Sequence, residues 1–325
     1  MSAVTVVVPT RNRREVLAVT LGAIFGQRGV DAKVVVVDEG SSDETPDYLE
    51  KLVGERLEVV RHDQPKGLAA ARNAGLERVT TPWVAFCDDD DIWAPDKLSA
   101  QLGEVARVRG ARWAITGAVS VSPDMVIVGH QRAPRSGDLF PDMQCYNAAP
   151  AGGSSTMAET ALARELGGYD AWPTGCEDFD FATRLSKVAP VASVDRPLVA
   201  YRIWQGSMST NVAKMRTGHL RVVEAHRTPA ADPALAELGD LRAEQYWGRF
   251  HLRNRDRLGA LRAYTRIATR YRKPKQLAYA AWGAVSPVSA ERHQARQEQA
   301  AVPEAWKAEV AAWLRGVRPL DSLSA

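Results

Sequence analysis

The sequence predicts an α/β protein, with a mostly parallel sheet covered by helices on both faces and a helical region after it. Apolar strand-like runs alternate four times with helix-like runs in the first third of the chain. The strand-like runs have no polar face, which is typical of a sheet that is buried on both sides. The 325 residues, of which 45% are hydrophobic and 25% charged, fit an ordinary folded protein of about two domains.

The four strand–helix units follow one another without interruption. The first helix carries its apolar residues at helical spacing. The second is expected to begin with Ser42 as N-cap and Pro46 in its first turn, where the missing N–H costs little. Strands are expected at 4–8, 33–38, 57–61 and 83–87, and helices at 14–27, 43–52, 67–78 and 95–108.

The pattern is less regular from about residue 111 onward. Strands are expected at 112–121 and 195–201, and helices at 160–166 and 178–187, around a middle that is rich in Gly, Ser and Pro. Such a middle favours loops that shape a substrate site.

Beyond about residue 213 the chain reads as helices separated by prolines, and its charge changes sign. Residues 213–325 hold 20 Lys and Arg against 11 Asp and Glu, although the whole chain has a net charge of only +3. Arg249–Lys275 concentrates ten basic residues against one acidic residue, Asp256. Basic residues near an anionic membrane contribute about 1 kcal/mol each. We therefore expect peripheral membrane contact through Arg249–Lys275, with a solvated helical face as the alternative, and no nucleic-acid partner because no such motif accompanies the charge.

Cysteine content and apolar run lengths indicate the compartment. Cys87, Cys145 and Cys176 have no paired metal-ligand spacing, which favours a reducing compartment and argues against a zinc site. No apolar run approaches the roughly 20 residues of a membrane span. The first residues read as a strand rather than a signal peptide. We expect a cytoplasmic protein, peripheral on the inner face of the membrane where the basic run binds lipid.

Four consecutive carboxylates, Asp88–Asp91, are the strongest chemical signal. They follow the apolar run WVAF, at the carboxyl end of an expected strand, where open α/β sheets bind ligands. Adjacent carboxylates repel one another unless a cation lies among them. Mg²⁺ and Mn²⁺ take a few carboxylates together with substrate phosphates, so we expect one of these ions with a phosphate-bearing substrate. The alternative is a solvated acidic loop.

These blocks carry a family resemblance. Six segments of the chain resemble, in order and spacing, the successive blocks of the inverting family 2 glycosyltransferases. They are VTVVVPTRNR, VVVVDEGSSDET, KGLAAARNAG, WVAFCDDDDIWAPDKL, GGYD and CEDFDFATRL. The resemblance covers about residues 3–205. It implies a GT-A fold with a Rossmann-like sheet over residues 1–212, with a nucleotide-binding half of about 1–110 and an acceptor half of 111–212. Residues 213–325 are then a basic helical extension.

The resemblance also implies which residues bind the nucleotide and the metal. Asp38 and Glu39 occupy the family's paired acidic position, in which the second carboxylate, Glu39, accepts a hydrogen bond from the base. Arg72 lies near the base and the diphosphate. Asp90 is the direct ligand of Mn²⁺ or Mg²⁺, with Asp88 and Asp89 holding the metal, its water or the ribose. The implied nucleotide-binding residues are Pro9, Thr10, Arg11, Asp38, Glu39, Arg72, Asp88 and Asp89, and the implied metal ligands are Asp90 and Asp88.

A second chemical site is expected at Glu177 and Asp178. Sugar transfer with inversion needs a base that takes the proton of the acceptor hydroxyl. A carboxylate at the start of a helix is exposed and stabilised as an anion by the helix dipole. The resemblance makes Asp178 the base, and Glu177 either supports it or contacts the acceptor. The alternative is that both residues only cap the helix.

One position departs from the family pattern. The family commonly has Tyr-Arg-x-His near the end of this domain, and the His can complete the metal shell. This chain has Trp204 at that position, followed by 205–207, which contain no His. A His ligand is therefore absent there.

These observations together predict a metal-dependent, inverting glycosyltransferase. It would move a sugar from a nucleoside-diphosphate sugar, with UDP favoured, to an acceptor hydroxyl in cell-envelope glycan, glycolipid or natural-product synthesis. One alternative is a sugar nucleotidyltransferase, although PTRNRRE lacks the glycines of a triphosphate loop. The other is a catalytically silent sugar-nucleotide-binding partner, which would not need the base at Asp178.

Overall fold

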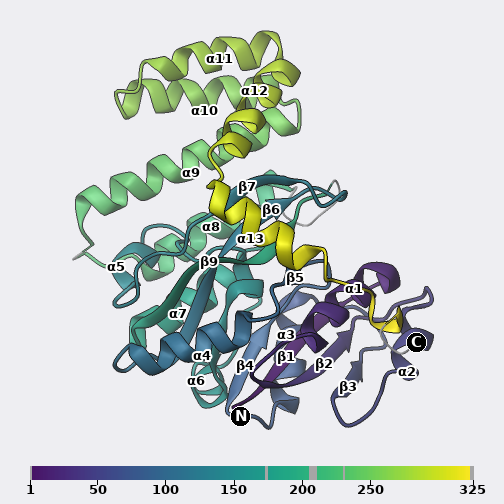
Figure 1. The fold of residues 1–325 in the computed structure, drawn as a ribbon. Helices are drawn as coiled ribbons and strands as arrows, with labels where there is room; N and C mark the ends of the chain where they lie inside the picture. The colour runs from purple at the N-terminus through teal and green to yellow at the C-terminus, as the bar shows by residue number, and fades with distance from the viewer. Residues whose placement is uncertain (1, 173–174, 205–210, 230, 323–325) are drawn as a thin grey trace.

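The computed structural model describes residues 2–172, 175–204, 211–229 and 231–322 (Figure 1). Within this part of the chain a nine-stranded sheet forms the centre, in the order β3-β2-β1-β4-β8-β6-β9-β5, with β7 paired to β6. The strands are β1 (Ala3–Thr10), β2 (Asp31–Asp38), β3 (Leu57–Arg61), β4 (Trp83–Phe86), β5 (Ile92–Trp93), β6 (Trp113–Val121), β7 (Ile127–Gln131), β8 (Met157–Glu159) and β9 (Val191–Arg202).

The first four expected strands form one parallel part of the sheet, and β6 and β9 form a second parallel pair. β1 pairs in parallel with β2 and β4, and β2 with β3. The prediction of a mostly parallel sheet is correct for this part, whereas the sheet as a whole is mixed. β8 runs antiparallel to β4 and β6, and β5 runs antiparallel to β9. β5 and β8 have two and three residues, too few to leave a pattern in the sequence.

Alternating side chains of the central strands pack into two hydrophobic cores, one on each face of the sheet. Val4, Val6 and Val8 of β1 point to the face covered by helices α1, α2 and α4, and Val7 points to the face covered by α3, α7 and α8. This alternation follows from the two-residue period of a strand. The covering helices are α1 (Arg14–Phe25), α2 (Thr45–Glu50), α4 (Lys97–Arg107), α3 (Leu68–Arg78), α7 (Glu177–Val188) and α8 (Val212–His226), with α5 (Phe140–Met143) and α6 (Thr160–Glu165) between them in the chain.

Helix α2 is shorter than expected. It begins at Thr45 with Glu44 as its N-cap and without a side-chain cap, so the expectation that Ser42 caps it is wrong. Asp43 Oδ1 accepts a hydrogen bond from the Thr45 N–H at 3.0 Å. The Ser42 N–H donates to Asn12 Oδ1 at 2.8 Å, which ties the loop after β2 to the loop after β1.

The helical C-terminal region has a small core of its own. Its helices are α9 (Pro233–Arg253), α10 (Arg257–Arg270), α11 (Lys275–Val285) and α12 (Pro287–Ala300). Figure 1 shows α10, α11 and α12 standing above the sheet, with α9 leading up to them. Leu252, Tyr264 and Ile267 are buried among these helices. None of the helices in the described part of the chain is long and apolar enough to cross a membrane.

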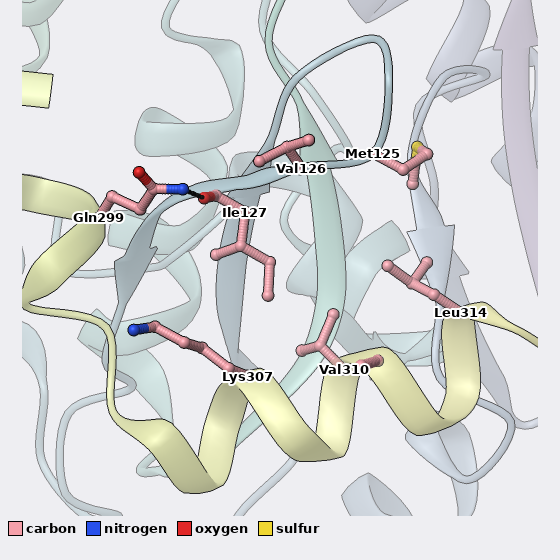
Figure 2. Close-up of a pocket in the computed structure, with 8 residues that line it drawn as sticks. Met125, Val126, Ile127, Gln299, Lys307, Val310 and Leu314 are labelled. Carbon is pink, nitrogen blue, oxygen red and sulfur yellow. Dashed lines mark hydrogen bonds between the residues drawn. The ribbon is translucent and has the colours of Figure 1, made fainter. Parts of the chain in front are cut away.

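Helix α13 (Glu304–Leu314) returns from this region to the sheet. Its Trp306 and Val310 are buried against Val119 and Val121 of β6. Figure 2 shows the groove between α13 and the β6–β7 hairpin, where Gln299 Nε2 of α12 donates to the Ile127 carbonyl oxygen at 3.0 Å.

The segment after α13 reaches the first helix of the chain. A Cβ atom added to Gly22 of α1 would lie 2.0 Å from the Arg318 carbonyl oxygen, so only glycine allows this approach. Residues near both ends of the sequence therefore share one packing layer. The division of the chain at residue 212 remains a prediction.

Candidate active site

The candidate site lies at the carboxyl ends of β1, β2 and β4, as expected for a sheet of this kind. The acidic cluster, defined as Asp88–Asp91, follows β4 directly. Its members differ in exposure: the side chains of Asp88 and Asp90 are 28% and 14% exposed, whereas that of Asp89 is 8% exposed. Asp91 is completely buried. The cluster is therefore part of the fold on one side and open on the other, unlike a solvated acidic loop.

Asp89 and Asp90 are held by two side chains from the N-terminal loop and one from beyond β9. Thr10 Oγ1 donates to Asp89 Oδ2 at 2.7 Å. Arg13 Nη1 donates at 2.8 Å to Asp89 Oδ1 and at 2.8 Å to Asp90 Oδ2. Trp204 Nε1 donates to the same Asp90 Oδ2 at 2.9 Å.

Burial opposes the negative charge on these carboxylates. It raises the pKa of Asp89 to about 7, and the charge of Asp90 adds to the rise, while Arg13 and Thr10 lower it. Burial and the nearby charge of Asp88 also raise the pKa of Asp90 above its ordinary value. A cation bound beside Asp90 would relieve this repulsion.

Arg72 joins the two sites that the sequence predicts separately. Its side chain is fully buried, with Nη2 at 2.7 Å from Asp88 Oδ1 and Nη1 at 2.7 Å from Asp178 Oδ1. The guanidinium also lies over the ring of Tyr169, with Cζ 4.9 Å from the ring centroid. The two carboxylates raise the pKa of Arg72 despite its burial, so it stays charged. Its predicted contact with the base and diphosphate remains a prediction.

Asp178 is the second residue of α7, at the positive end of the helix dipole. Burial raises its pKa to about 6; Arg72 counteracts this, and the charges of Asp88 and Glu177 add to it. The side chain keeps 25% of its surface exposed, so an acceptor hydroxyl can approach it. Glu177, the first residue of the helix, is buried.

Two glycines fit closely around Asp178. A Cβ atom on Gly152 would lie 2.8 Å from Asp178 Oδ2, and one on Gly153 would lie 3.0 Å from Asp178 Oδ1 and 3.0 Å from Arg72 Nη2. Gly152 also has a φ of +49°. The space that these glycines leave is taken by the ion pair.

Helix α7 is anchored by an ion pair of the buried Asp180, two residues after the base. Asp180 Oδ2 accepts from Arg184 Nε at 2.7 Å, and Asp180 Oδ1 bonds His226 Nε2 at 2.8 Å. Arg184 also donates to the carbonyl oxygens of Leu166 and Gly168, each at 2.7 Å. These bonds fix the helix that carries Asp178.

The acidic pair after β2 makes its contacts away from the acidic cluster. Asp38 Oδ1 accepts from the Ser41 N–H at 3.0 Å. Glu39 Oε2 accepts from the Lys66 and Gly67 N–H groups at 2.8 and 2.7 Å, and Glu39 Oε1 bonds His62 Nδ1. A carboxylate oxygen has lone pairs for more than one donor. The predicted bond from Glu39 to a base is therefore compatible with this geometry and remains a prediction.

The predicted loop after β1 is partly buried and partly exposed. Pro9 is buried as part of β1, whereas Arg11 is exposed. Asn12 between Arg11 and Arg13 has a φ of 54°, and its N–H donates to Ser41 Oγ at 2.8 Å. This turn directs Arg13, which the sequence analysis did not select, toward the acidic cluster.

Asp88 and Asp90 suit a divalent cation that also binds a substrate. Among the described residues, no group of three or more His, Cys, Asp or Glu side chains is placed to hold a metal ion. Asp88 and Asp90 each use one oxygen in the bonds described above, which leaves one hard oxygen donor on each. Two carboxylates completed by phosphate oxygens and water are what Mg²⁺ and Mn²⁺ accept. Trp204 cannot replace a His ligand, because the indole N–H only donates.

Sequence reasoning missed Arg13 and His62. Arg11, Arg13 and Arg14 lie within four residues, and nothing in the sequence distinguishes the one that faces the carboxylates. His62 is a lone histidine after an edge strand. Its contact with Glu39 depends on the parallel pairing of β2 with β3, which places the ends of these strands side by side.

Comparison with known proteins gives a family match and a fold match. Residues 5–119 match the model of the family described as Glycosyl transferase family 2. The chain is 36% identical over 116 residues to TuaG of Bacillus subtilis, a glycosyltransferase named for teichuronic acid biosynthesis; the match covers 35% of this chain and 46% of TuaG. The aligned part of the chain spans less than half the length of the curated relatives it matches first.

Two solved structures share the fold. Residues 1–349 of S. aureus TarS in complex with UDP-GlcNAc superpose with a TM-score of 0.58 at 15% identity, over 92% of this chain and 93% of TarS 1–349. The mannosyltransferase PcManGT from Pyrobaculum calidifontis, in complex with GDP-Man and Mn²⁺, gives a TM-score of 0.55 at 20% identity, over 96% of this chain and 85% of that one. At these identities the likeness shows the fold alone, and it confirms the expected GT-A class.

Proposed function

We propose that this chain, whose residues 5–119 match the model of glycosyl transferase family 2, transfers a sugar from a nucleoside-diphosphate sugar to an acceptor hydroxyl with inversion at the anomeric carbon. The observation that carries the proposal is the Arg72 bridge. It holds a carboxylate of the donor side, Asp88, and a carboxylate of the acceptor side, Asp178, at 2.7 Å each. The reaction needs both, fixed relative to one another.

In the proposed mechanism Asp178 is the base. The acceptor oxygen attacks the anomeric carbon while its proton passes to a carboxylate oxygen of Asp178, and the bond to the diphosphate breaks on the opposite face. Arg72 keeps Asp178 ionised and oriented. Asp88 and Asp90 would hold Mn²⁺ or Mg²⁺, which supplies positive charge for the departing diphosphate.

The donor proposed is UDP-linked, and the product a cell-envelope glycan or a related glycolipid. The TarS complex contains UDP-GlcNAc, and TuaG is named for teichuronic acid biosynthesis. These names support the class of reaction without specifying the sugar.

A thermal-unfolding panel tests the donor site. Wild type and Asp90→Ala are measured with UDP, GDP, dTDP, CMP and the triphosphate UTP, each with and without Mn²⁺. A ligand at about 100 times its dissociation constant stabilises the folded state by about 2.7 kcal/mol. We expect a metal-dependent shift with UDP that Asp90→Ala loses. A shift with a triphosphate alone would instead favour a nucleotidyltransferase.

Asp178→Asn separates the transferase from a silent nucleotide-binding partner. The variant is expected to keep the UDP-dependent shift and to lose transfer by about 10² to 10⁴-fold in kcat, the usual contribution of a general base. Transfer at the wild-type rate would remove Asp178 from the mechanism. Wild type that binds UDP and transfers nothing to any acceptor in a broad panel would favour the silent partner.

We also propose that the basic run at Arg249–Lys275 contacts an anionic membrane. Part of the run is already paired within the protein: Arg249 lies 3.7 Å from Glu298, and Arg266 2.9 Å from Glu244. Other basic side chains on α10 and at its two ends are exposed and have no ion pair among the described residues, namely Arg255, Arg257, Arg262, Arg272, Lys273 and Lys275. The side chain of Arg253 lies outside the described residues.

Exposed apolar side chains accompany these charges. Leu258 on α10 and Leu277 on α11 are 63% and 48% exposed. A surface that combines cations with exposed leucines suits an anionic lipid interface. The membrane and cytoplasmic location of the protein remain part of this proposal.

Vesicle co-sedimentation tests the contact. Binding is expected to grow with the anionic lipid fraction and to fall with salt. Replacing Arg272, Lys273 and Lys275 by Gln should weaken it, whereas replacing the exposed Arg28, Arg109 and Arg135 by Gln should not. Equal binding by both triple variants would overturn the contact.

A further inference from the structure

One oxygen of the Asp90 carboxylate, the predicted metal ligand, already accepts hydrogen bonds from two donors of the protein. Arg13 Nη1 and Trp204 Nε1 both donate to its Oδ2 atom, at 2.8 and 2.9 Å. The Arg13 guanidinium also lies over the Trp204 ring, with Cζ 4.6 Å from the ring centroid. Arginine, indole and carboxylate thus form one closed cluster.

This cluster provides what a metal ion would provide. The Arg13 guanidinium is a permanent cation, and its Nη1 atom bridges Asp89 and Asp90 at 2.8 Å each. A divalent cation placed on Asp90 would meet a positive charge a few ångströms away, which opposes its binding. Trp204 turns its N–H toward the same oxygen, and an N–H group repels a cation.

Arg13 is also able to move without disturbing the fold. Its side chain is 28% exposed, in contrast to the fully buried Arg72. Its backbone is fixed independently, because the Arg13 N–H donates to Thr45 Oγ1 at 3.2 Å and the residue is the N-cap of α1. Release of the side chain from Asp90 therefore leaves β1 and α1 in place.

We propose that Arg13 and Trp204 form a clasp that competes with the divalent cation for Asp90. The protein without a donor then binds Mn²⁺ weakly, and a diphosphate opens the clasp by offering Arg13 anionic oxygens in exchange for the carboxylate. A guanidinium suits this exchange because its N–H groups match phosphate oxygens as well as carboxylates. The inference deepens the proposed function by assigning Arg13 and Trp204 as the residues that set metal affinity at its donor site.

Mn²⁺ binding to the full chain, followed by electron paramagnetic resonance at pH 8, tests the clasp without any sugar donor. Arg13→Gln removes the cation and keeps an amide donor, and Trp204→Phe keeps the ring and removes the N–H. Arg28→Gln, an exposed arginine between α1 and β2, is the matched control. We expect the dissociation constant for Mn²⁺ to fall about tenfold in Arg13→Gln, as expected for a coupling of ordinary size between two sites, less in Trp204→Phe, and not at all in the control.

A second arm adds UDP. In wild type, UDP should strengthen Mn²⁺ binding by more than it does in Arg13→Gln, because the variant has no clasp to open and no guanidinium to place on the diphosphate. Unchanged or weaker Mn²⁺ binding by Arg13→Gln in the first arm overturns the proposal, since Arg13 would then organise the metal site instead of competing for it. Should Arg13→Gln unfold, Trp204→Phe decides: affinity equal to wild type overturns the clasp.

These outcomes are separate from those of the proposed function. Mn²⁺ affinity that rises in Arg13→Gln supports the clasp even where wild type transfers no sugar. Transfer by wild type with Mn²⁺ affinity unaffected by Arg13→Gln supports the proposed function and removes the clasp.

Discussion

Two arginines in different regions of the molecule show opposite uses of the same side chain. Arg72, beside the sheet, is fully buried and lies 2.7 Å from each of two carboxylates. Arg270, on α10, is 65% exposed and lies 3.2 Å from Asp240. Water screens the second pair and cannot reach the first arginine. The contribution of an arginine–carboxylate pair to stability can therefore be judged only when the burial of both side chains is known.

The difference follows from how each region is built. At the carboxyl ends of the strands, the loop after β1, the loop after β4 and the start of α7 converge. Their charged side chains are therefore partly or fully buried. In the helical region the charges lie on the outer surfaces of helices whose core is apolar. Buried charges of the first region should control activity and stability, and exposed charges of the second should control surface contacts.

The largest expected effect is the replacement of Arg72 by Met. The change keeps an unbranched aliphatic stem, removes the guanidinium and leaves Asp88 and Asp178 facing each other without a cation. Breaking a buried ion pair from one side costs about 3 kcal/mol. Urea unfolding should show a loss of this size, and Arg270→Met is the control. Equal losses for the two variants would remove the distinction between the regions.

The next effect concerns pH and Asp178. Since burial raises its pKa to about 6, the base is protonated below that pH, and kcat/KM should fall about tenfold for each pH unit below 6. Ionising this carboxyl costs folding free energy, so the unfolding free energy should decrease from about pH 4 to about pH 6, and Asp178→Asn should lose that decrease.

A pH–rate profile and urea titrations at several pH values measure both effects. A rate that stays constant between pH 4.5 and 7 would show that the ionisation of Asp178 does not limit the reaction.

A smaller effect is expected from Gly153→Ala. The new methyl group would lie 3.0 Å from both Asp178 Oδ1 and Arg72 Nη2, so the ion pair must shift. Overpacking of this kind costs about 1–2 kcal/mol. Displacement of the base should also lower kcat by about tenfold. Thermal unfolding and initial rates measure the two consequences.

Gly103→Ala is the matched control for that change. Nothing lies within 4 Å of the methyl group that it adds, and alanine favours the helix by about 0.5–1 kcal/mol over glycine. It should stabilise the protein and leave the rate unchanged. A rate that falls equally in both variants would mean that the fit of Gly153 around the ion pair is not what matters.

The smallest effect is expected from Arg270→Gln. Exposed ion pairs contribute less than about 1 kcal/mol, and many contribute nothing measurable. We expect a change in the unfolding free energy of less than about 0.5 kcal/mol, measured by urea unfolding. A loss comparable to that of Arg72→Met would show that α10 and α9 depend on this pair and that exposure alone does not separate the regions.

The parallel pairing of β1 to β4 could be predicted because its signal is local. Each strand from β1 to β4 is an apolar run followed by a helical run. Strands that alternate with helices along the chain in this way lie next to one another in the sheet. β5 and β8 could not be predicted, since two or three residues acquire their pairing only from their neighbours. The contact of Trp306 with β6 could not be predicted either, because an amphipathic helix does not indicate what it covers.

The candidate site was predictable to the extent that its residues carry a sequence motif. The motif selects Asp88, Asp90 and Asp178, and the fold brings them into one neighbourhood of ion pairs, while their roles remain predictions. Arg72 was selected as well, but its position between two carboxylates is a property of the folded chain. Arg13 reaches the acidic cluster only because the backbone turns at Asn12. This turn cannot be predicted from the residue types alone.

The close approach of Gly22 to Arg318 has a consequence for how the chain folds. Loop closure between segments from opposite ends of a sequence is the slowest kind of contact to form, because the chain loses the most freedom before any packing compensates. The parallel strands can associate early, while the layer that contains α1, α13 and the outer face of β6 must wait for the segment around Arg318. During synthesis that layer stays exposed until residue 318 has left the ribosome, so the order in which the chain emerges sets the time for which its apolar surface is open to other proteins.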